Sequence, residues 1–105
     1  NGDTVAGELA YALEAEQLVF LTDVTGVMDG GGRVIRRLDR RRANILSNSG
    51  VIQGGMIPKL SACLRALECS PVANIIDGRQ PDALIECIRG NSTGTTIVSD
   101  FRSRR

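Results

Sequence analysis

The sequence predicts one α/β domain, a sandwich of helices on a mainly parallel sheet. Segments with helical spacing of apolar residues alternate along the chain with short, continuous apolar runs. The first such run, Leu18–Leu21, is typical of a strand buried on both faces, which is the habit of parallel sheets. The length of 105 residues limits the chain to one hydrophobic core.

The composition excludes several classes of function. The charges nearly cancel, with 13 basic and 12 acidic residues, so no overall field favours nucleic acid or a membrane as a partner. The chain has no histidine, which excludes Ser/His/Asp triads, Cys/His pairs and HExxH zinc sites. No metal site is predicted from its own side chains.

The cysteines and the apolar runs indicate the compartment. Cys63, Cys69 and Cys87 are odd in number and form no CxxC pair, which fits a reducing compartment better than a disulfide framework. The run Leu18–Leu21 is far too short to cross a membrane. We expect a cytoplasmic protein, or a plastid or mitochondrial one in a eukaryote.

The first predicted helix follows Asp3, whose carboxylate can cap it. Five apolar residues then share one helical face: Val5, Ala6, Leu9, Ala10 and Leu13. Asp3 has a second possible role, because a carboxylate at this helix start could orient the ammonium of Lys59.

The strand Leu18–Leu21 runs directly into Thr22 and Asp23, before a turn at Gly26. Ligands of open α/β sheets bind at the carboxyl ends of strands, which is where these polar residues would lie. Asp23 could accept a hydrogen bond from a ribose hydroxyl or cap the turn, and its position alone leaves both roles open.

A glycine turn at Gly30–Gly32 separates Val27–Met28 from Arg33–Ile35, which predicts a hairpin at the edge of a site. The run Arg36–Arg42 contains five arginines, and Asp39 within it is a natural helix cap. We expect the arginines to form a solvated helix face; a subunit or regulatory contact is the alternative.

The segment Gly50–Lys59, GVIQGGMIPK, joins glycines, a proline and a lysine at one helix entrance. Pro58 suits a first helical turn, so the helix should begin near it. A lysine in that turn is disfavoured by the helix dipole by about 0.3 to 1 kcal/mol, and a bound phosphate would offset this cost. A glycine loop with a solvated lysine is the alternative.

The remainder continues the alternation of helix and strand. The helix after Lys59 should pack through Leu60, Cys63, Leu64 and Leu67, with Cys63 as a core residue. Val72–Ile76 is the next strand, and Thr95–Val98, entered from Gly94, is the last. Between them, a helix opening at Pro81 should turn Leu84, Ile85 and Ile88 inward and end near Gly90.

Five segments, in this order, carry a specific resemblance: NGDTVAGELA, LTDVTGVMDGGG, GVIQGGMIPK, IIDGR and GTTIV. They resemble the carboxyl-terminal half of the N-acetylglutamate kinases, within the amino acid kinase family. The resemblance covers nearly all of residues 1–98 and implies a three-layer α/β/α sandwich. It implies transfer of the γ-phosphoryl of MgATP to the side-chain carboxylate of N-acetyl-L-glutamate, in arginine biosynthesis.

The resemblance also implies roles for particular residues. Lys59 would stabilise the transferring phosphoryl group, Asp3 would organise the catalytic lysines, and Asn1 would belong to the substrate-binding motif. ATP would meet two segments, through Thr22, Asp23, Val24, Thr25, Gly26, Val27, Met28, Val51, Ile52, Gln53, Gly55 and Met56. Mg²⁺ would be bound through the nucleotide.

We expect a fragment, since the amino-terminal lobe of the family has no counterpart here. Residues 1–99 would form the nucleotide-binding half and 100–105 a mobile basic tail, so the chain alone should show little or no turnover. The resemblance implies a homo-oligomer at full length, with a nitrogen-signalling protein as a possible partner. The alternatives are the non-catalytic kinase-like domain of an acetylglutamate synthase and another amino acid kinase.

Three positions argue against feedback inhibition by arginine. Arginine-inhibited members of the family usually carry a histidine where Asp82 stands, and glutamate and glycine where Asn91 and Ser92 stand. A bound arginine forms its strongest hydrogen bonds with a carboxylate, which Asn91 does not supply.

Overall fold

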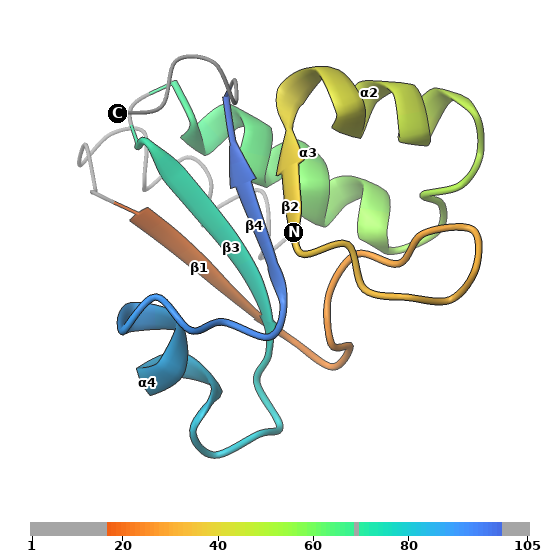
Figure 1. The fold of residues 1–105 in the computed structure, drawn as a ribbon. Helices are drawn as coiled ribbons and strands as arrows, with labels where there is room; N and C mark the ends of the chain where they lie inside the picture. Colours follow the sequence, from red (N-terminus) through yellow and green to blue (C-terminus); the bar gives the residue numbers. More distant parts are fainter. Residues whose placement is uncertain (1–16, 69, 100–105) are drawn as a thin grey trace.

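A computed structural model describes residues 17–68 and 70–99. In this part of the chain four strands form one sheet in the order β1-β3-β4-β2 (Figure 1). The strands are β1 Gln17–Thr22, β2 Arg37–Asp39, β3 Val72–Asp77 and β4 Thr95–Val98. The helices are α2 Arg40–Asn48, α3 Met56–Ala66 and α4 Ala83–Ile88.

The sheet is mixed, with two parallel pairings and one antiparallel pairing. β1 runs parallel to β3, β2 runs parallel to β4, and β3 and β4 are antiparallel. The six residues of α4 rise about 9 Å, whereas the six residues of β3 span about 20 Å. α4 alone does not span the length of β3, and β4 pairs with β3 in the antiparallel direction.

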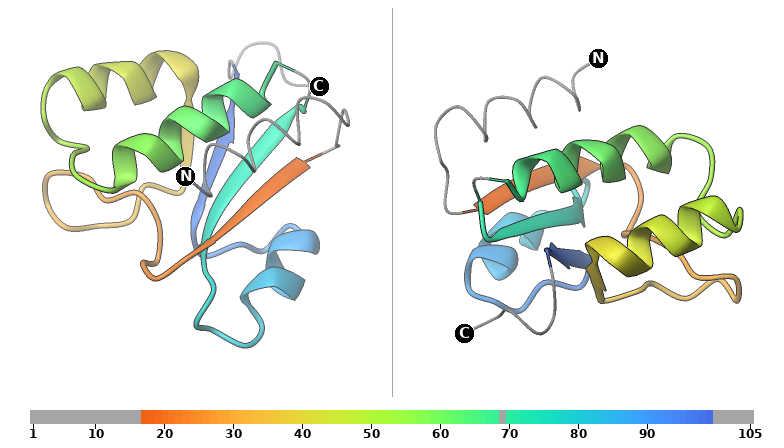
Figure 2. Two further views of the ribbon diagram at one scale, coloured as in Figure 1. Left: turned by 180° about the vertical axis from the view of Figure 1, so that it is seen from behind. Right: turned by 90° about the horizontal axis from the view of Figure 1, so that it is seen from above.

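The sheet lies between helices, as the resemblance implies. In the view from above, α3 lies on one side of the sheet and α4 on the other, with α2 beside α3 (Figure 2). This confirms the predicted α/β sandwich and places the core mainly under α3. None of the helices in the described ranges is long and apolar enough to cross a membrane.

The predicted stripe of α3 is confirmed. Leu60 and Cys63 are buried against the sheet, Leu67 is buried just after the helix, and Leu64 is partly buried against the same core. Burying a leucine side chain stabilises a fold by about 1.5 to 3 kcal/mol. This stripe fixes the direction of α3, and therefore the position of its amino-terminal end.

Two burial predictions are wrong. Leu21 is 60% exposed, and among the described residues its strand, β1, pairs with β3 alone. On α4, Leu84, Ile85 and Ile88 are 40, 49 and 64% exposed, and Cys87 is the buried residue. An apolar run does not reveal whether its strand is central, and apolar spacing along a short helix does not reveal which of its faces packs on the sheet.

Two boundaries differ from the prediction. α3 begins at Met56, so Pro58 is its third residue. The first four N–H groups of a helix have no partner within the helix, so proline, which lacks an N–H, is still tolerated at this position. Residues Arg37–Asp39 form β2, a strand that the arginine run concealed. Asp39 does cap α2, since its side chain accepts a hydrogen bond of 2.8 Å from the amide of Arg42.

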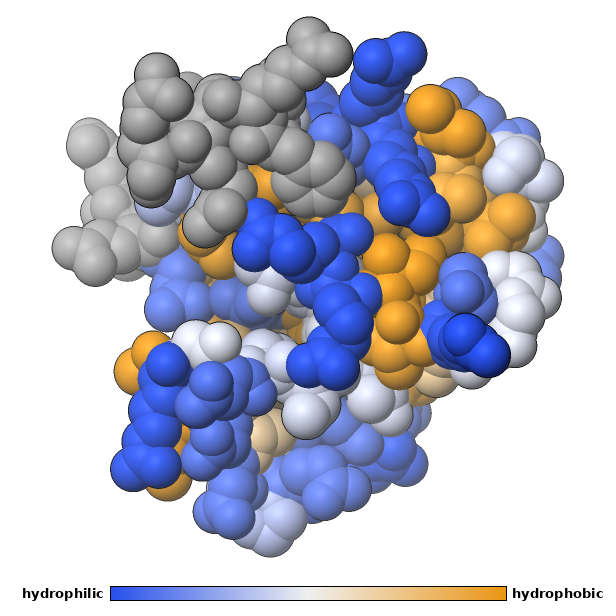
Figure 3. Space-filling view, in the orientation of Figure 1, coloured by the Kyte–Doolittle hydropathy of each residue, from blue (hydrophilic) through white to orange (hydrophobic). Residues whose placement is uncertain are grey.

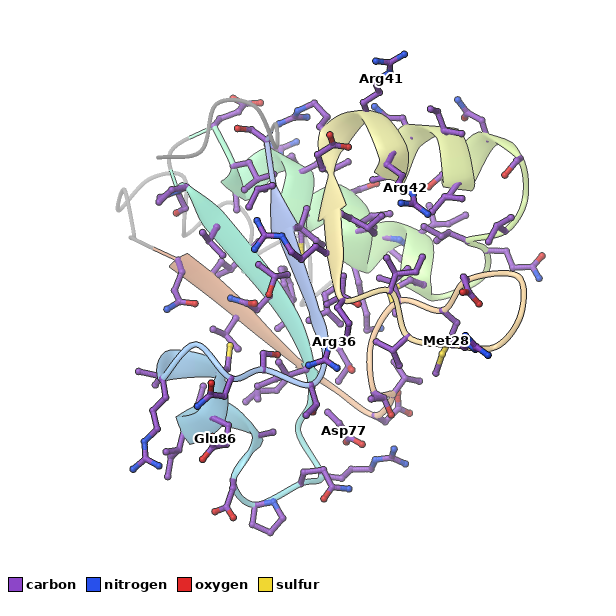
Figure 4. All side chains as sticks on the ribbon, in the orientation of Figure 1. Met28, Arg36, Arg41, Arg42, Asp77 and Glu86 are labelled. Carbon is purple, nitrogen blue, oxygen red and sulfur yellow. The ribbon has the colours of Figure 1, made fainter. Side chains whose placement is uncertain are left out.

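The arginines around α2 are mostly solvated. Arg41 and Arg42 are exposed, and Arg41 projects away from the molecule in Figure 4. Arg40 is partly buried and donates to the carbonyl of Leu64 at 2.8 Å. On the face drawn in Figure 3, apolar side chains run from α2 toward the hairpin between hydrophilic ones, and Ile45 is 55% exposed.

The predicted first helix, Asn1, Asp3, Cys69 and the tail 100–105 lie outside the described residues.

Candidate functional site

Two segments that are distant in sequence form the walls of one cleft of about 380 Å³. One wall is the loop and hairpin strand that follow β1, and the other is the loop that enters α3. The lining residues are Asp23, Val24, Gly26, Val27, Met28, Val51, Ile52, Gln53, Gly55, Met56 and Lys59.

The first wall is a short hairpin, as predicted. The amide of Ile35 donates to the carbonyl of Val27 at 2.7 Å, and the amide of Asp29 donates to the carbonyl of Arg33 at 2.8 Å. The Asp29 carboxylate accepts from the amides of Arg33 and Gly31, and these bonds hold its pKa below the ordinary value. Gly32, with a φ of 82°, makes the turn possible.

The second wall depends on two glycines with positive φ and one buried anchor. Gly50 and Gly54 have φ of 84° and 65°, so the chain reverses sharply between α2 and α3. Ile52 between them is 3% exposed, and its amide donates to the carbonyl of Leu46 at 3.1 Å. The loop is therefore fixed to the end of α2.

The amino-terminal end of α3 gives the cleft a positive character. Its cap residue, Gly55, has no side chain to bond the first N–H groups, and the first turn contains no acidic residue. The first N–H groups of a helix lack helical partners and carry partial positive charge. Lys59 adds an ammonium from the same turn and is partly buried in the cleft wall. This arrangement suits an anion with several oxygens, such as a phosphate chain.

The sequence itself matches a family of known enzymes over this region. The model of the amino acid kinase family matches residues 1–76, which include both walls of the cleft. The chain belongs to the amino acid kinase family.

Individual relatives agree with this assignment. The chain is 46% identical over 104 residues to an acetylglutamate kinase of Dehalococcoides mccartyi, covering 99% of this chain and 38% of that protein. The N-acetylglutamate synthase of Neisseria gonorrhoeae, solved with coenzyme A and L-arginine, is 26% identical with a TM-score of 0.83, over 93% of this chain and 23% of that chain. The carbamate kinase of Giardia lamblia bound to AMP-PNP is 22% identical and shares the fold with a TM-score of 0.81. This match covers 95% of this chain and 36% of the carbamate kinase chain.

Most residues that the family resemblance assigns to ATP come together in the cleft. Ten of the twelve line it with Lys59; Thr22 and Thr25 do not. Thr22 is buried beneath the loop, where its hydroxyl accepts from the amide of Val24 and lies 3.1 Å from the carbonyl oxygen of Ile76. Asn1 and Asp3 lie outside the described residues, so their assigned roles stay predictions.

Thr25 lines a second cavity, of about 360 Å³, on the side of α4. Figure 4 shows Met28 on the hairpin and Asp77 and Glu86 toward α4, so the loop after β1 separates the two cavities. Asp77 receives paired hydrogen bonds of 2.9 Å from the Arg79 guanidinium. This pairing lowers the pKa of Asp77 to about 2.

Sequence reasoning missed Thr95. In the sequence it is one of two threonines at the start of an apolar strand, with no sign of which one turns inward. In the structure it is fully buried and joins β4 to both strands of the hairpin, through Val27 and Ile35. A threonine directly after a glycine at the start of a buried strand is the only signal that the sequence offered.

Proposed function

We propose that this chain is the nucleotide-binding half of an acetylglutamate kinase. In this proposal MgATP binds in the cleft between the hairpin and the entrance of α3, and its γ-phosphoryl passes to the side-chain carboxylate of N-acetyl-L-glutamate. The single observation that carries the proposal is the meeting of the two family segments in one cleft, with Lys59 in its wall. The chain spans 38% of the length of the kinase from D. mccartyi, so the reaction is proposed for the whole protein.

The chemistry of phosphoryl transfer fits the groups in the cleft. It depends mostly on positioning the reactants and on countering charge, and it needs no histidine base. The positive end of α3 and the Lys59 ammonium would hold the phosphate oxygens, while Val24, Met28 and Met56 offer apolar surface for the base. Bound Mg²⁺ would neutralise phosphate charge. Asp23 is the one carboxylate among the described residues that line the cleft, and it would face the ribose or the metal.

The decisive experiment replaces Lys59 in the whole protein that contains this chain. If Lys59 meets charge that grows in the transition state, Lys59→Met should lower kcat by about 10²- to 10³-fold, on the scale of losing one oxyanion donor. Arg65→Met is the matched control, because Arg65 is an exposed cation in the last turn of the same helix. Equal kcat values for Lys59→Met and wild type, with N-acetyl-L-glutamate as substrate, would contradict the proposal.

A second candidate is the kinase-like domain of an acetylglutamate synthase, favoured by the structural likeness to the N. gonorrhoeae protein. The higher identity to the D. mccartyi kinase favours the first candidate. The two differ in their need for nucleotide: a domain that only regulates or assembles requires neither MgATP nor Lys59. Calorimetry with MgATP distinguishes the two candidates. Only the kinase hypothesis predicts saturable binding of MgATP that becomes weaker in Lys59→Met.

The remaining parts of the proposal concern the whole protein. We propose a cytoplasmic homo-oligomer, with a nitrogen-signalling protein as a possible regulator. We expect the isolated chain to bind nucleotide without robust turnover, which a coupled assay for ADP would test. The expectation of no arginine inhibition rests on Asp82, Asn91 and Ser92, which stand where arginine-inhibited members usually carry histidine, glutamate and glycine. An arginine titration of the whole enzyme would test it.

A further inference from the structure

The hairpin that forms the first wall of the cleft has an incomplete hydrogen-bond ladder. The amide of Ile35 donates to the carbonyl of Val27 at 2.7 Å. In a regular antiparallel pair, the amide of Val27 would return a bond to the carbonyl of Ile35. Here these two groups are joined through a third residue, Thr95 on β4.

The Thr95 hydroxyl occupies the missing position in the ladder. Its oxygen accepts from the amide of Val27 at 2.8 Å, and its hydrogen is donated to the carbonyl of Ile35 at 2.7 Å. Thr95 and Val27 are both 0% exposed, so water cannot replace the hydroxyl without rearrangement. Both hairpin strands are thereby attached to the central sheet through one oxygen atom.

Two glycines allow this close approach. A Cβ atom at Gly26 would lie 2.8 Å from the Thr95 hydroxyl oxygen and 3.1 Å from a methyl carbon of Val34. A Cβ atom at Gly94 would overlap the carbonyl oxygen of Ile75 and lie 3.0 Å from the carbonyl oxygen of Thr25. The loop, the hairpin and the two central strands are therefore packed as one unit around Thr95.

We propose that Thr95 is a positioning residue for nucleotide binding, which holds the hairpin wall of the cleft at the distance from α3 that the ligand requires. The inference rests on the proposed function. Thr95 does not line the cleft, and it acts through Val27, which does. Without the hydroxyl, the buried amide of Val27 and carbonyl of Ile35 lose their partner, and the strand must shift to recover one.

The test compares three variants at neighbouring positions. Thr95→Val keeps the shape of the side chain and removes the hydroxyl, and Thr95→Ser keeps the hydroxyl. Thr96→Val is the matched control, since its hydroxyl also makes a partly buried bond, to the side-chain oxygen of Asn74 at 2.7 Å, and this bond does not involve the hairpin. The probe is MgAMP-PNP, and its Kd is measured by calorimetry at a temperature where every variant is folded.

We expect Thr95→Val to raise the Kd by about tenfold or more, and Thr95→Ser and Thr96→Val to stay within about threefold of wild type. Equal affinity of Thr95→Val and wild type overturns the inference while leaving the proposed function intact. An equal loss in Thr96→Val overturns it too, because the effect would then follow stability alone. If wild type does not bind the probe, the proposed function itself fails.

A measurement on the unmodified chain covers the case in which Thr95→Val does not fold. Amide hydrogen exchange should find Val27 as protected as Ile97 in the middle of β4, because both amides would open only with the sheet. Exchange of Val27 at the rate of an exposed loop amide would show that Thr95 does not hold the wall, and would overturn the inference.

Discussion

Helices α3 and α4 begin from similar sequence signals and end in different environments. Each follows or contains a proline and carries apolar residues at helical spacing. α3 has eleven residues and buries Leu60, Ala62, Cys63 and Ala66. α4 has six residues and buries only Cys87. The comparison shows that the longer helix contacts more of the neighbouring elements and therefore buries more of its apolar residues.

The same contrast separates the two cavities. The cleft lies at the end of the helix that packs on β1, β3 and α2, so its walls are fixed by the core. The second cavity lies beside a short helix that packs mainly on β3. We therefore expect changes on the α3 side to affect stability and nucleotide binding strongly, and changes on α4 to be tolerated.

The largest expected difference is in core packing. Leu60→Ala should destabilise the fold by about 2 to 5 kcal/mol, because Leu60 is 2% exposed and its loss leaves a cavity. Ile88→Ala should change stability by less than about 0.5 kcal/mol, because Ile88 is 64% exposed. Urea unfolding of both variants measures the difference. Similar losses would mean that α4 is as well packed as α3.

A smaller difference is expected at the helix caps. Asp39→Ala should cost about 1 kcal/mol, because the Asp39 carboxylate accepts from the amide of Arg42 at 2.8 Å. Asp82 occupies the cap position of α4 and makes no such bond, so Asp82→Ala should be nearly neutral. Thermal unfolding midpoints of the two variants test this. A larger loss in Asp82→Ala would contradict the contrast between the helices.

The smallest effect concerns acid stability on the α4 side. The Arg79 side chain lowers the pKa of Asp77 from its ordinary 3.8 to about 2, so this pairing stabilises the folded state fully above the ordinary pKa. The contribution is lost as the pH falls from about 4 to about 2. Asp77→Asn should therefore lose less stability than wild type between about pH 5 and pH 2.5. If wild type and Asp77→Asn lose the same free energy of unfolding between these two pH values, as measured by urea unfolding, the role of the pair is refuted.

Much of the fold could be predicted from the sequence because its signals are local. The apolar runs predicted β1, β3 and β4, the glycine turn predicted the hairpin, and Asp39 marked the start of α2. β2 was missed because Arg37 and Asp39 flank its one buried residue, Leu38, and a single apolar residue gives no period. The antiparallel pairing of β3 and β4 had no local signal in the sequence, and the helical pattern overestimated the length of α4.

The cleft was predicted only in part, for a similar reason. Family segments identified both walls, but the sequence does not show which side chains of a loop face the ligand. Thr22 turns toward Ile76 and Thr25 toward the second cavity. Thr95 is 68 residues from Val27, and only the folded sheet brings them together.

The central claim is that a nucleotide brings its phosphates to Lys59 at the entrance of α3. Lys59 is the only lysine of the chain, so an acyl phosphate of ATP, which transfers its acyl group to a lysine beside the bound phosphates, tests the claim directly. Mass spectrometry of the labelled protein should find the acyl group on Lys59, with the labelling suppressed by excess MgATP. If Lys59 is not labelled, or if excess MgATP does not reduce its labelling, the claim is contradicted.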